Sequence, residues 1–484
     1  MRGRLFGGGL AVAMGALVVA ALPASGQSVS GREAVAAIEY EPLEFVPPRP
    51  ERHEVLGVTT LLLEDRALPL VTVIARFRGG YGLFDREWYA AAMGLPAMLR
   101  YGGTSGLAPD SVELLLEHYA MQTSFESGGV SVGSTLNTLT EHLDESLALW
   151  WDMISAPGFD EAQIDVWRGR ELERVLRRAD DAGGAAYSAF NRLLYGDHSI
   201  GWEIDESDLE PERVTPERFR DVHARVICRE NLTLGVSGDA SWDAMRPRLE
   251  RLVDALAPCE GSPPASPIPE IRRGGGVFLI ERDLEQAVIV MAHPTAVRLA
   301  DEPSFFAATI GNAILGGGGF SSRILQRVRS DEGYAYSASS LWTMPRRYDG
   351  LVGAVTRTSP ENAVPAVRVI LRTMEELREA APAATELKTA VDRVVNGYVF
   401  NFQTSDQIVS RMMLYDSGEL PEDWLERYAE GVQEVTTEDV RRVFADNLRP
   451  AEMTILVVGD PDRIGRDALA VIGPVTVLAP RQPD

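Results

Sequence analysis

The organisation of the chain is clearest in Thr215-Pro-Glu-Arg-Phe-Arg220 and the run Asn231-Leu-Thr-Leu-Gly-Val-Ser-Gly-Asp239 that follows it. The chain repeats this pattern 221 residues later, as Thr436-Thr-Glu-Asp-Val-Arg441 and Met453-Thr-Ile-Leu-Val-Val-Gly-Asp460. In each copy, a threonine followed by acidic residues is typical of a helix N-terminus. A run rich in β-branched residues then ends in Gly-Asp, which is typical of a turn. The sequence is therefore interpreted as a tandem duplication.

A second, weaker match supports the same duplication, because Leu61-Leu-Leu-Glu64 corresponds to Phe278-Leu-Ile-Glu281. Between the copies, residues 257–273 are rich in proline and small residues, which predicts an extended linker. We expect domains at about 40–256 and 274–484. Each half mixes short alternating strands (71–77 and 287–291) with amphipathic helices, at 111–119, 139–154, 161–178 and 360–380. This mixture predicts an α+β fold of two homologous domains, each a mainly antiparallel sheet packed with helices.

The N-terminus predicts export. Arg2 and Arg4 precede an apolar run from Leu10 to Leu22, and small residues follow it, which is typical of a signal peptide cleaved after about Gly26. Without residues 1–26, the chain has 45 basic and 71 acidic residues, so its formal charge moves from −24 to −26. So acidic a chain argues against a nucleic-acid partner and favours cationic ones, although solubility alone also explains the charge. We expect an exported protein, periplasmic or extracellular and soluble, with no membrane span after cleavage.

The chain has two cysteines, Cys228 and Cys259. In an oxidising compartment they could form a disulfide that closes a loop of about 30 residues. Two cysteines are too few for a four-thiolate zinc site. Sequence alone does not tell whether their Cα atoms are near enough to bond.

Several segments in order resemble the pitrilysin/insulinase-type zinc peptidases, in the short form with two domains per subunit. The clearest is Ile314-Leu-Gly-Gly-Gly-Gly-Phe-Ser-Ser-Arg-Ile-Leu-Gln-Arg-Val-Arg329, which continues to Gly333-Tyr-Ala-Tyr336. Further matches lie at 193–198, 358–363 and 401–408. The resemblance covers most of the mature chain.

Active members of that family carry His-x-x-Glu-His on a helix of the first domain, where two imidazoles hold zinc and the glutamate activates water. The matching stretch here is Gly94-Leu-Pro-Ala-Met98. Gly94 and Met98 stand at the histidine positions and Ala97 at the position of the base. The later glutamate ligand would fall near Arg174, with Glu171 and Glu173 beside it. We therefore predict that this chain binds no metal or other cofactor and that zinc belongs to a partner subunit.

The resemblance also implies a substrate-binding pair, because active members use an arginine and a tyrosine of the second domain beside the metal. Arg329 and Tyr336 keep the family's seven-residue spacing, and Tyr334 is the neighbouring competitor. We expect Arg329 to end a helix with Gly333 as its left-handed cap, and Tyr336 to lie on the next strand. Without the resemblance, the same pair would be a helix-terminal arginine and a half-buried strand tyrosine. For Gly316, Gly317, Gly318 and Gly319, close approach to substrate or partner and a flexible turn remain alternatives.

Two functions follow from these expectations. In the first, this chain is the non-catalytic subunit of a heterodimeric zinc peptidase and supplies Arg329 and Tyr336 to a shared peptide-binding chamber. It would be inactive alone and would need a zinc-bearing paralogous partner and a peptide substrate. In the second, the chain is a catalytically silent structural or binding member of the family, in which Arg329 and Tyr336 are vestigial.

Overall fold

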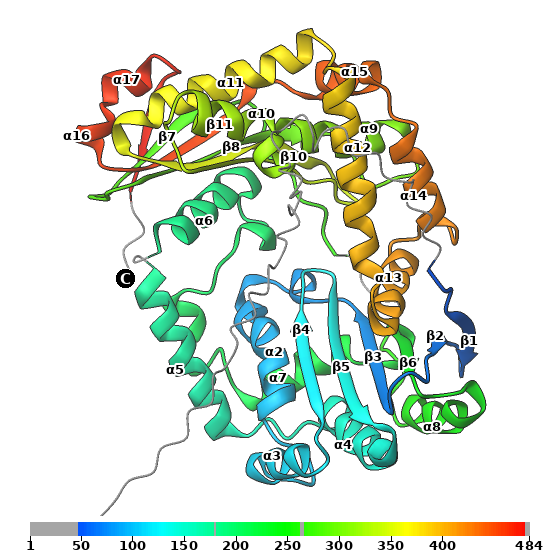
Figure 1. The fold of residues 1–484 in the computed structure, drawn as a ribbon. Coiled ribbons are helices and arrows are strands. Elements are labelled where there is room, and N and C mark those ends of the chain that lie inside the picture. Colours follow the sequence, from blue (N-terminus) through cyan, green and yellow to red (C-terminus); the bar gives the residue numbers. More distant parts are fainter. Residues whose placement is uncertain (1–46, 179–180, 262–265, 480–484) are drawn as a thin grey trace, which may run out of the picture. The chain divides into compact units, whose positions relative to one another are not determined.

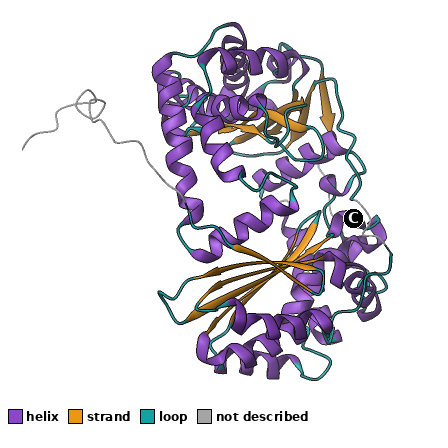
Figure 2. Ribbon diagram, turned by 90° about the vertical axis from the view of Figure 1, so that its right-hand side faces the viewer, coloured by secondary structure: helices purple, strands orange, loops and turns teal. Residues whose placement is uncertain are grey.

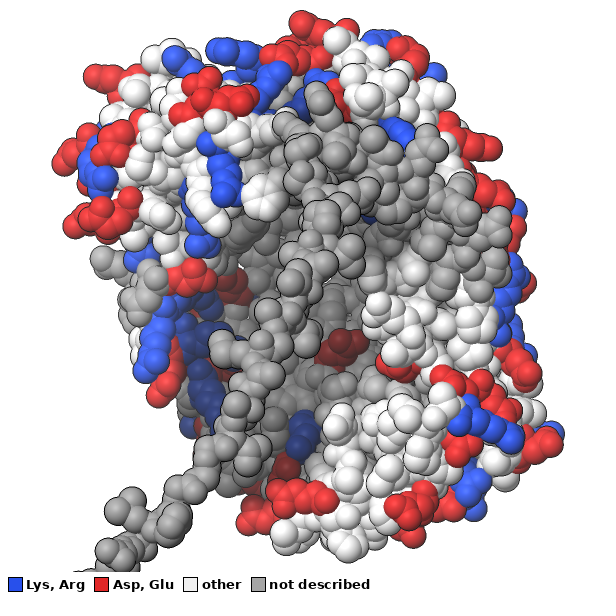
Figure 3. All heavy atoms as spheres, viewed as in Figure 1, with Lys and Arg blue, Asp and Glu red and all other residues white. Residues whose placement is uncertain are grey.

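The computed structural model describes residues 47–178, 181–261 and 266–479. The signal peptide expected within residues 1–26 lies outside these ranges, and so does the expected start of the first domain at residue 40. Within the described ranges, no helix combines the length and the apolar character that a membrane crossing requires. On the face shown in Figure 3, basic and acidic side chains intermingle.

The first six strands form one sheet in the order β1-β2-β6-β3-β5-β4. Neighbouring strands are antiparallel except β2 and β6, which are parallel. The strands are β1 (Glu51–Val55), β2 (Val58–Glu64), β3 (Leu70–Arg78), β4 (Gln122–Ser127), β5 (Ser131–Leu139) and β6 (Leu232–Gly238).

The second sheet repeats this arrangement in the order β12-β7-β11-β8-β10-β9. Its β12–β7 and β7–β11 pairs are parallel and the others are antiparallel. The strands are β7 (Gly276–Glu281), β8 (Ala287–Thr295), β9 (Ser337–Trp342), β10 (Gly350–Thr358), β11 (Thr454–Gly459) and β12 (Val475–Leu478). Five strands of each sheet share one order, which confirms two homologous α+β halves, and the edge strands β1 and β12 differ in chain position and direction. Both sheets are mixed, with helices packed against them (Figure 2).

Helices flank both sheets (Figure 1). Those of the first half are α2 (Tyr89–Tyr101), α3 (Pro109–His118), α4 (Leu143–Ser155), α5 (Glu161–Arg177), α6 (Ala182–Tyr195), α7 (Pro216–Val226) and α8 (Trp242–Asp254). Those of the second half are α9 (Pro303–Asn312), α10 (Arg323–Leu325), α11 (Ala363–Glu379), α12 (Ala384–Val399), α13 (Ser405–Ser417), α14 (Trp424–Gln433), α15 (Thr437–Asn447), α16 (Pro461–Ile464) and α17 (Arg466–Ala470).

The repeated segments form the predicted helix–strand units, α7–β6 and α15–β11. The Thr215 hydroxyl accepts a hydrogen bond from the Arg218 backbone N–H at 3.3 Å, and Thr436 accepts one from Asp439 at 3.1 Å. Both threonines therefore satisfy a free N–H group of the first turn, as a helix cap does. One predicted boundary is wrong: Leu139 ends β5, and the helix expected from residue 139 begins as α4 at Leu143, after a 3-10 turn.

The central strands of both sheets are largely buried on both faces, but the second face of β3 carries polar residues at Thr72 and Arg76. In β3, alternate residues Val71, Val73, Ala75 and Phe77 enter the core formed with the helices of the first half. In β8, which the sequence suggested was alternating, both faces are buried. Ile289 and Met291 enter the core of the second half, whereas Val288 and Val290 pack against α6.

Helices α6 and α13 occupy equivalent places in the duplication, and each packs on the sheet of the other half. Phe190 and Leu194 of α6 join the cluster on β8 and β11. Val409 and Met413 of α13 pack against Leu61 of β2 and other residues of the first sheet. The two halves thus exchange one helix each.

Cys228 and Cys259 form a disulfide, with their Cα atoms 5.0 Å apart. The bond joins the segment after α7 to the expected linker, whose described residues form neither helix nor strand. The Glu230 carboxylate accepts a hydrogen bond from the Cys259 backbone N–H and reinforces this junction.

Candidate functional site

Helix α2 holds the three positions where metal ligands and base were expected. Gly94 and Met98 face the core of the first half, and Met98 is only 1% exposed. A β-carbon on Gly94 would lie 2.8 Å from the Trp167 ring of α5 and 3.0 Å from the Phe219 ring of α7. Ala97 is half-buried and packs against the same core. The segment is therefore packed as hydrophobic core.

The expected third ligand position lies on α5, beside an ion pair. Glu171 is 7% exposed, and its Oε1 accepts a hydrogen bond from Arg174 at 2.6 Å. Glu173 lies 3.9 Å from Arg177. The only buried carboxylate in this stretch of α5 is thus already paired with a cation.

These residues do not fit a zinc ion. A thioether and a methyl group replace nitrogen and oxygen donors, and the glycine position has no room for an imidazole beneath Trp167. In the described part of the chain, no group of three or more His, Cys, Asp and Glu residues could hold a metal.

The other candidate residues lie on a helical segment of the second half that is fixed on three sides. It consists of α10 and the π-helical turns Gln326–Asp331. Arg323 donates two hydrogen bonds of 2.8 Å to Glu386 of α12, which lower the pKa of that carboxyl. Arg327 pairs with Glu376 of α11. Ile324 and Val328 are fully buried. The backbone that carries Arg329 is therefore rigidly placed.

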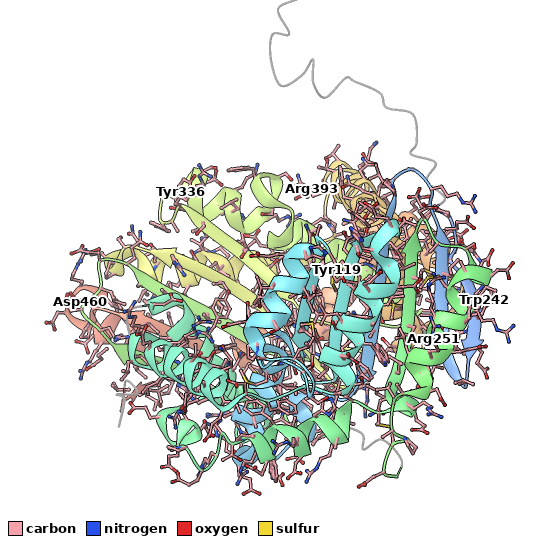
Figure 4. The ribbon with its side chains drawn as sticks, turned by 90° about the horizontal axis from the view of Figure 1, so that it is seen from below. Tyr119, Trp242, Arg251, Tyr336, Arg393 and Asp460 are labelled. Carbon is pink, nitrogen blue, oxygen red and sulfur yellow. A yellow bond between two sulfur atoms is a disulfide. The ribbon has the colours of Figure 1, made fainter. Side chains whose placement is uncertain are left out.

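Arg329 contacts aromatic rings instead of acids. Its guanidinium carbon lies 4.5 Å from the centre of the Tyr336 ring and 4.9 Å from that of Phe320. Among the described residues, no carboxylate pairs with it. Tyr336 is 80% exposed and Phe320 73% exposed, although large aromatic side chains are usually at least partly buried. Figure 4 shows Tyr336 at the outer edge of the ribbon. We call Phe320, Arg329 and Tyr336 the aromatic–arginine cluster.

Two details differ from the sequence-based expectation. The helical segment continues two residues past Arg329, to Asp331, and Tyr336 lies one residue before β9 instead of on it. Gly333 has the predicted left-handed conformation, with φ of +67°. Tyr334 is half-buried, with its ring packed against the core of the second half, whereas Tyr336 is 80% exposed.

At Gly316 and Gly319, the structure of this chain itself explains why glycine is required. A β-carbon on Gly316 would lie 2.2 Å from the Ser340 backbone nitrogen, so the close approach is to β9 of this chain. Gly319 has a φ of +64°, a conformation that glycine adopts without strain. This turn presents Phe320, while Arg393 of α12 donates a 2.8 Å hydrogen bond to Ser321. Sequence reasoning missed Phe320, and its only signal was an aromatic residue directly after four glycines.

Comparison with known proteins agrees with this fold. Residues 213–394 match the family described as "Peptidase M16 inactive domain". An uncharacterized zinc protease of Streptomyces coelicolor is 26% identical over 337 residues, which cover 67% of this chain and 68% of that protein. A non-peptidase homolog, YmxG, of Helicobacter pylori is 23% identical over 58% of this chain and 64% of its own length. The alignments thus span about two thirds of these relatives.

Solved structures share the fold. A peptidase M16 inactive domain from Pseudomonas fluorescens aligns with a TM-score of 0.76 at 21% identity, over 85% of this chain and 98% of that one. The periplasmic protease PqqL from Escherichia coli aligns with a TM-score of 0.73 at 12% identity, over 87% of this chain and 47% of that one.

The fold is thus a two-sheet fold of the peptidase M16 type, in which the helix expected at the metal site is packed as core. Residues 213–394 match the family's inactive domain and the relatives are M16-like proteins, which confirms the resemblance inferred from sequence.

Proposed function

We propose that this chain is the substrate-binding, non-catalytic subunit of an exported heterodimeric zinc peptidase. The observation that carries the proposal is the contrast between two places in the chain. The helix that would hold zinc is packed as core, whereas half-buried Arg329, near the end of a fixed helical segment, stacks on the exposed ring of Tyr336.

The chemistry of the pair suits a peptide. The Arg329 guanidinium is always charged and can donate two parallel hydrogen bonds to a peptide carbonyl or carboxylate. The Tyr336 hydroxyl can donate one hydrogen bond to an oxygen that gains negative charge during hydrolysis. Stacking over two rings restricts the guanidinium, so less side-chain entropy is lost when the substrate binds. Zinc and the water that it activates would come from the partner.

Export is part of the proposal. It is supported by the N-terminal sequence pattern, by the disulfide, since such bonds persist in oxidising compartments, and by the periplasmic location of the structural relative PqqL. The domain boundaries expected at 40–256 and 274–484 remain proposals.

The test is reconstitution of activity. The partner would be isolated by co-purification from the native host and recognised by its His-x-x-Glu-His motif. A quenched fluorescent peptide would then be incubated with each chain alone and with the mixture. We expect hydrolysis only in the mixture, and a fall of at least about tenfold with Arg329→Ala, because a charged hydrogen bond contributes roughly 1.5–3 kcal/mol.

The matched control is Arg347→Ala, which removes an exposed arginine that has no ion pair among the described residues. It should leave the rate unchanged. Full activity of the Arg329→Ala mixture would refute the proposal.

A catalytically silent binding subunit is the alternative, and the printed name of the Helicobacter relative, a non-peptidase homolog, favours it. In that case the partner would hydrolyse the peptide equally fast with and without this chain. Substitutions of Arg329 and Tyr336 would then change nothing.

A further inference from the structure

A polar cavity of about 390 Å³ lies where α13 covers the first sheet. The sheet side is formed by β3 and β5, and the helix side by α13 and the 3-10 turn Phe400–Phe402. The residues that matter for its chemistry are Thr72, Arg76, Thr135, Asn401, Asp406 and Arg411. It is separate from the aromatic–arginine cluster, none of whose residues lines it.

The equivalent interface in the other half shows how unusual this lining is. Where α6 covers the second sheet, β8 contributes Val288, Val290 and Ala292, and the interface is a closed apolar cluster. The corresponding face of β3 contributes Thr72, Ile74 and Arg76, of which only Ile74 joins an apolar cluster with α13. Both halves thus have a helix packed on a sheet, but the interface between α13 and the first sheet also contains a polar cavity.

The two arginines of the cavity lack acidic partners. Among the described residues, Arg76 has no hydrogen bond or ion pair, and Arg411 donates only to the side-chain oxygen of Asn401, at 2.7 Å. Both are half-buried. A guanidinium withdrawn from water without a counterion is costly, so an anion that entered the cavity would be bound favourably.

We propose that this cavity is a binding site for a carboxylate group, held by Arg76 of β3 and Arg411 of α13. The planar guanidinium matches the two oxygens of a carboxylate. Asp406 also lines the cavity, so its charged groups sum to one positive charge. A singly charged carboxylate balances this lining, whereas a phosphate dianion would leave an excess of negative charge beside Asp406.

Two sources offer this group in a peptide, namely the C-terminal carboxylate and an acidic side chain. Three peptides with the same N-terminal fluorescein label separate them. The first is an alanine-based hexapeptide with a free C-terminus, the second is its C-terminal amide, and the third is the amide with one central glutamate. Binding to the full chain alone would be measured by fluorescence anisotropy at low salt, since salt screens such contacts.

We expect the free-acid peptide, the glutamate peptide or both to bind at least about tenfold more tightly than the neutral amide. Arg76→Gln and Arg411→Gln should each weaken that binding by about 10- to 100-fold, which is the range of a charged hydrogen bond. Arg76→Lys should give an intermediate loss, because an ammonium keeps the charge and loses the planar fork. Arg347→Gln, outside the cavity, is the matched control and should bind as the unmodified chain does.

Equal binding of all three peptides, or no measurable binding of any, would overturn the proposal. So would unchanged binding by both glutamine variants, whose folding would be checked by thermal unfolding. Because the assay contains no partner subunit and leaves Arg329 intact, its failure would not affect the function proposed above.

Discussion

The backbone of Gly94 on α2 lies directly against the indole ring of Trp167 on α5. A β-carbon at residue 94 would stand 2.8 Å from ring atom Cζ2, closer than real β-carbons approach other atoms. Trp167 is itself 9% exposed and packs edge-on against Phe219, which is fully buried. The ring cannot easily move aside. This contact therefore sets the spacing of α2 and α5, and it leaves no room for a histidine side chain at residue 94.

Gly94→Ala should therefore destabilise the protein although alanine favours helices. Forcing a methyl group into packed core typically costs about 1–3 kcal/mol. Chemical denaturation would measure the change in the free energy of unfolding.

The matched control is Gly169→Ala on α5, where a β-carbon would meet nothing within 4 Å. There the gain in helix propensity should stabilise by about 0.5–1 kcal/mol. Stabilisation by both substitutions would contradict the packing described for α2.

Tyr336→Phe separates the two roles of the phenol. The ring that stacks on Arg329 stays, and only the hydroxyl donor is lost. Because the side chain is 80% exposed, the free energy of unfolding should change by less than about 0.5 kcal/mol. In the mixture with the zinc-bearing partner, kcat should fall by about 10²–10³-fold if the hydroxyl stabilises a developing oxyanion.

A second variant, Tyr334→Phe, serves as the control, because the Tyr334 ring packs against the core of the second half and its phenol interacts with Glu332 instead of Arg329. An equal loss of rate in both variants would contradict the assignment to Tyr336.

Reduction of the disulfide should lower stability without unfolding the chain outright. The bond closes a loop of 31 residues, for which chain entropy predicts a contribution of about 3–4 kcal/mol. The Arg229 backbone N–H donates to the Ala257 carbonyl oxygen at 3.0 Å, and because this contact does not involve the disulfide, we expect the loss to lie toward the low end. Urea denaturation with and without dithiothreitol measures the difference.

The double variant Cys228→Ser/Cys259→Ser is the control, and dithiothreitol should not affect it. If reduction shifted that variant equally, the loss would have another cause.

Acidification should destabilise the protein partly through His223. Burial lowers the pKa of this imidazole, and its hydrogen bond with the Ile154 carbonyl oxygen opposes that effect only in part. The unfolded chain therefore binds a proton more readily than the folded one. The contribution of neutral His223 is complete above the unfolded pKa of about 6.5 and is lost as the pH falls below it.

Urea unfolding at pH 7.5 and pH 5.5 would measure the contribution of neutral His223 to the free energy of unfolding. His223→Gln keeps a donor for Ile154 and cannot titrate, so it should lose less stability than the unmodified chain on acidification. An identical loss in both proteins would exclude His223 as a cause.

The duplicated fold was predictable because its signals are local. The threonine caps of α7 and α15 and the strands that follow are each set by neighbouring residues, so the repeat at 215–239 and 436–460 could be read directly. The packing of α6 and α13 on the sheet of the opposite half could not be predicted, since the apolar face of an amphipathic helix does not indicate which sheet it will contact. The nearly continuous apolar run of β8 was a signal, because strands buried on both faces are typically so.

Some features of the candidate site could likewise be predicted from local sequence, and others could not. The absence of ligands at Gly94, Ala97 and Met98 was evident from the sequence, whereas the contact with Trp167 that removes the space required coordinates. The resemblance predicts Tyr336 on the strand after the helix, but the left-handed Gly333 and the hydrogen bond from the Tyr334 N–H to the Val328 carbonyl oxygen delay the strand until Ser337. Phe320 and the polar cavity depend on long-range packing that no local pattern encodes.

The most direct measurement is the metal content of the purified, untagged chain after incubation with excess zinc and removal of unbound ions. The packing of α2 predicts far less than one zinc per chain and no change in thermal stability on adding zinc. One zinc bound per chain, with a matching rise in the unfolding temperature, would contradict the account.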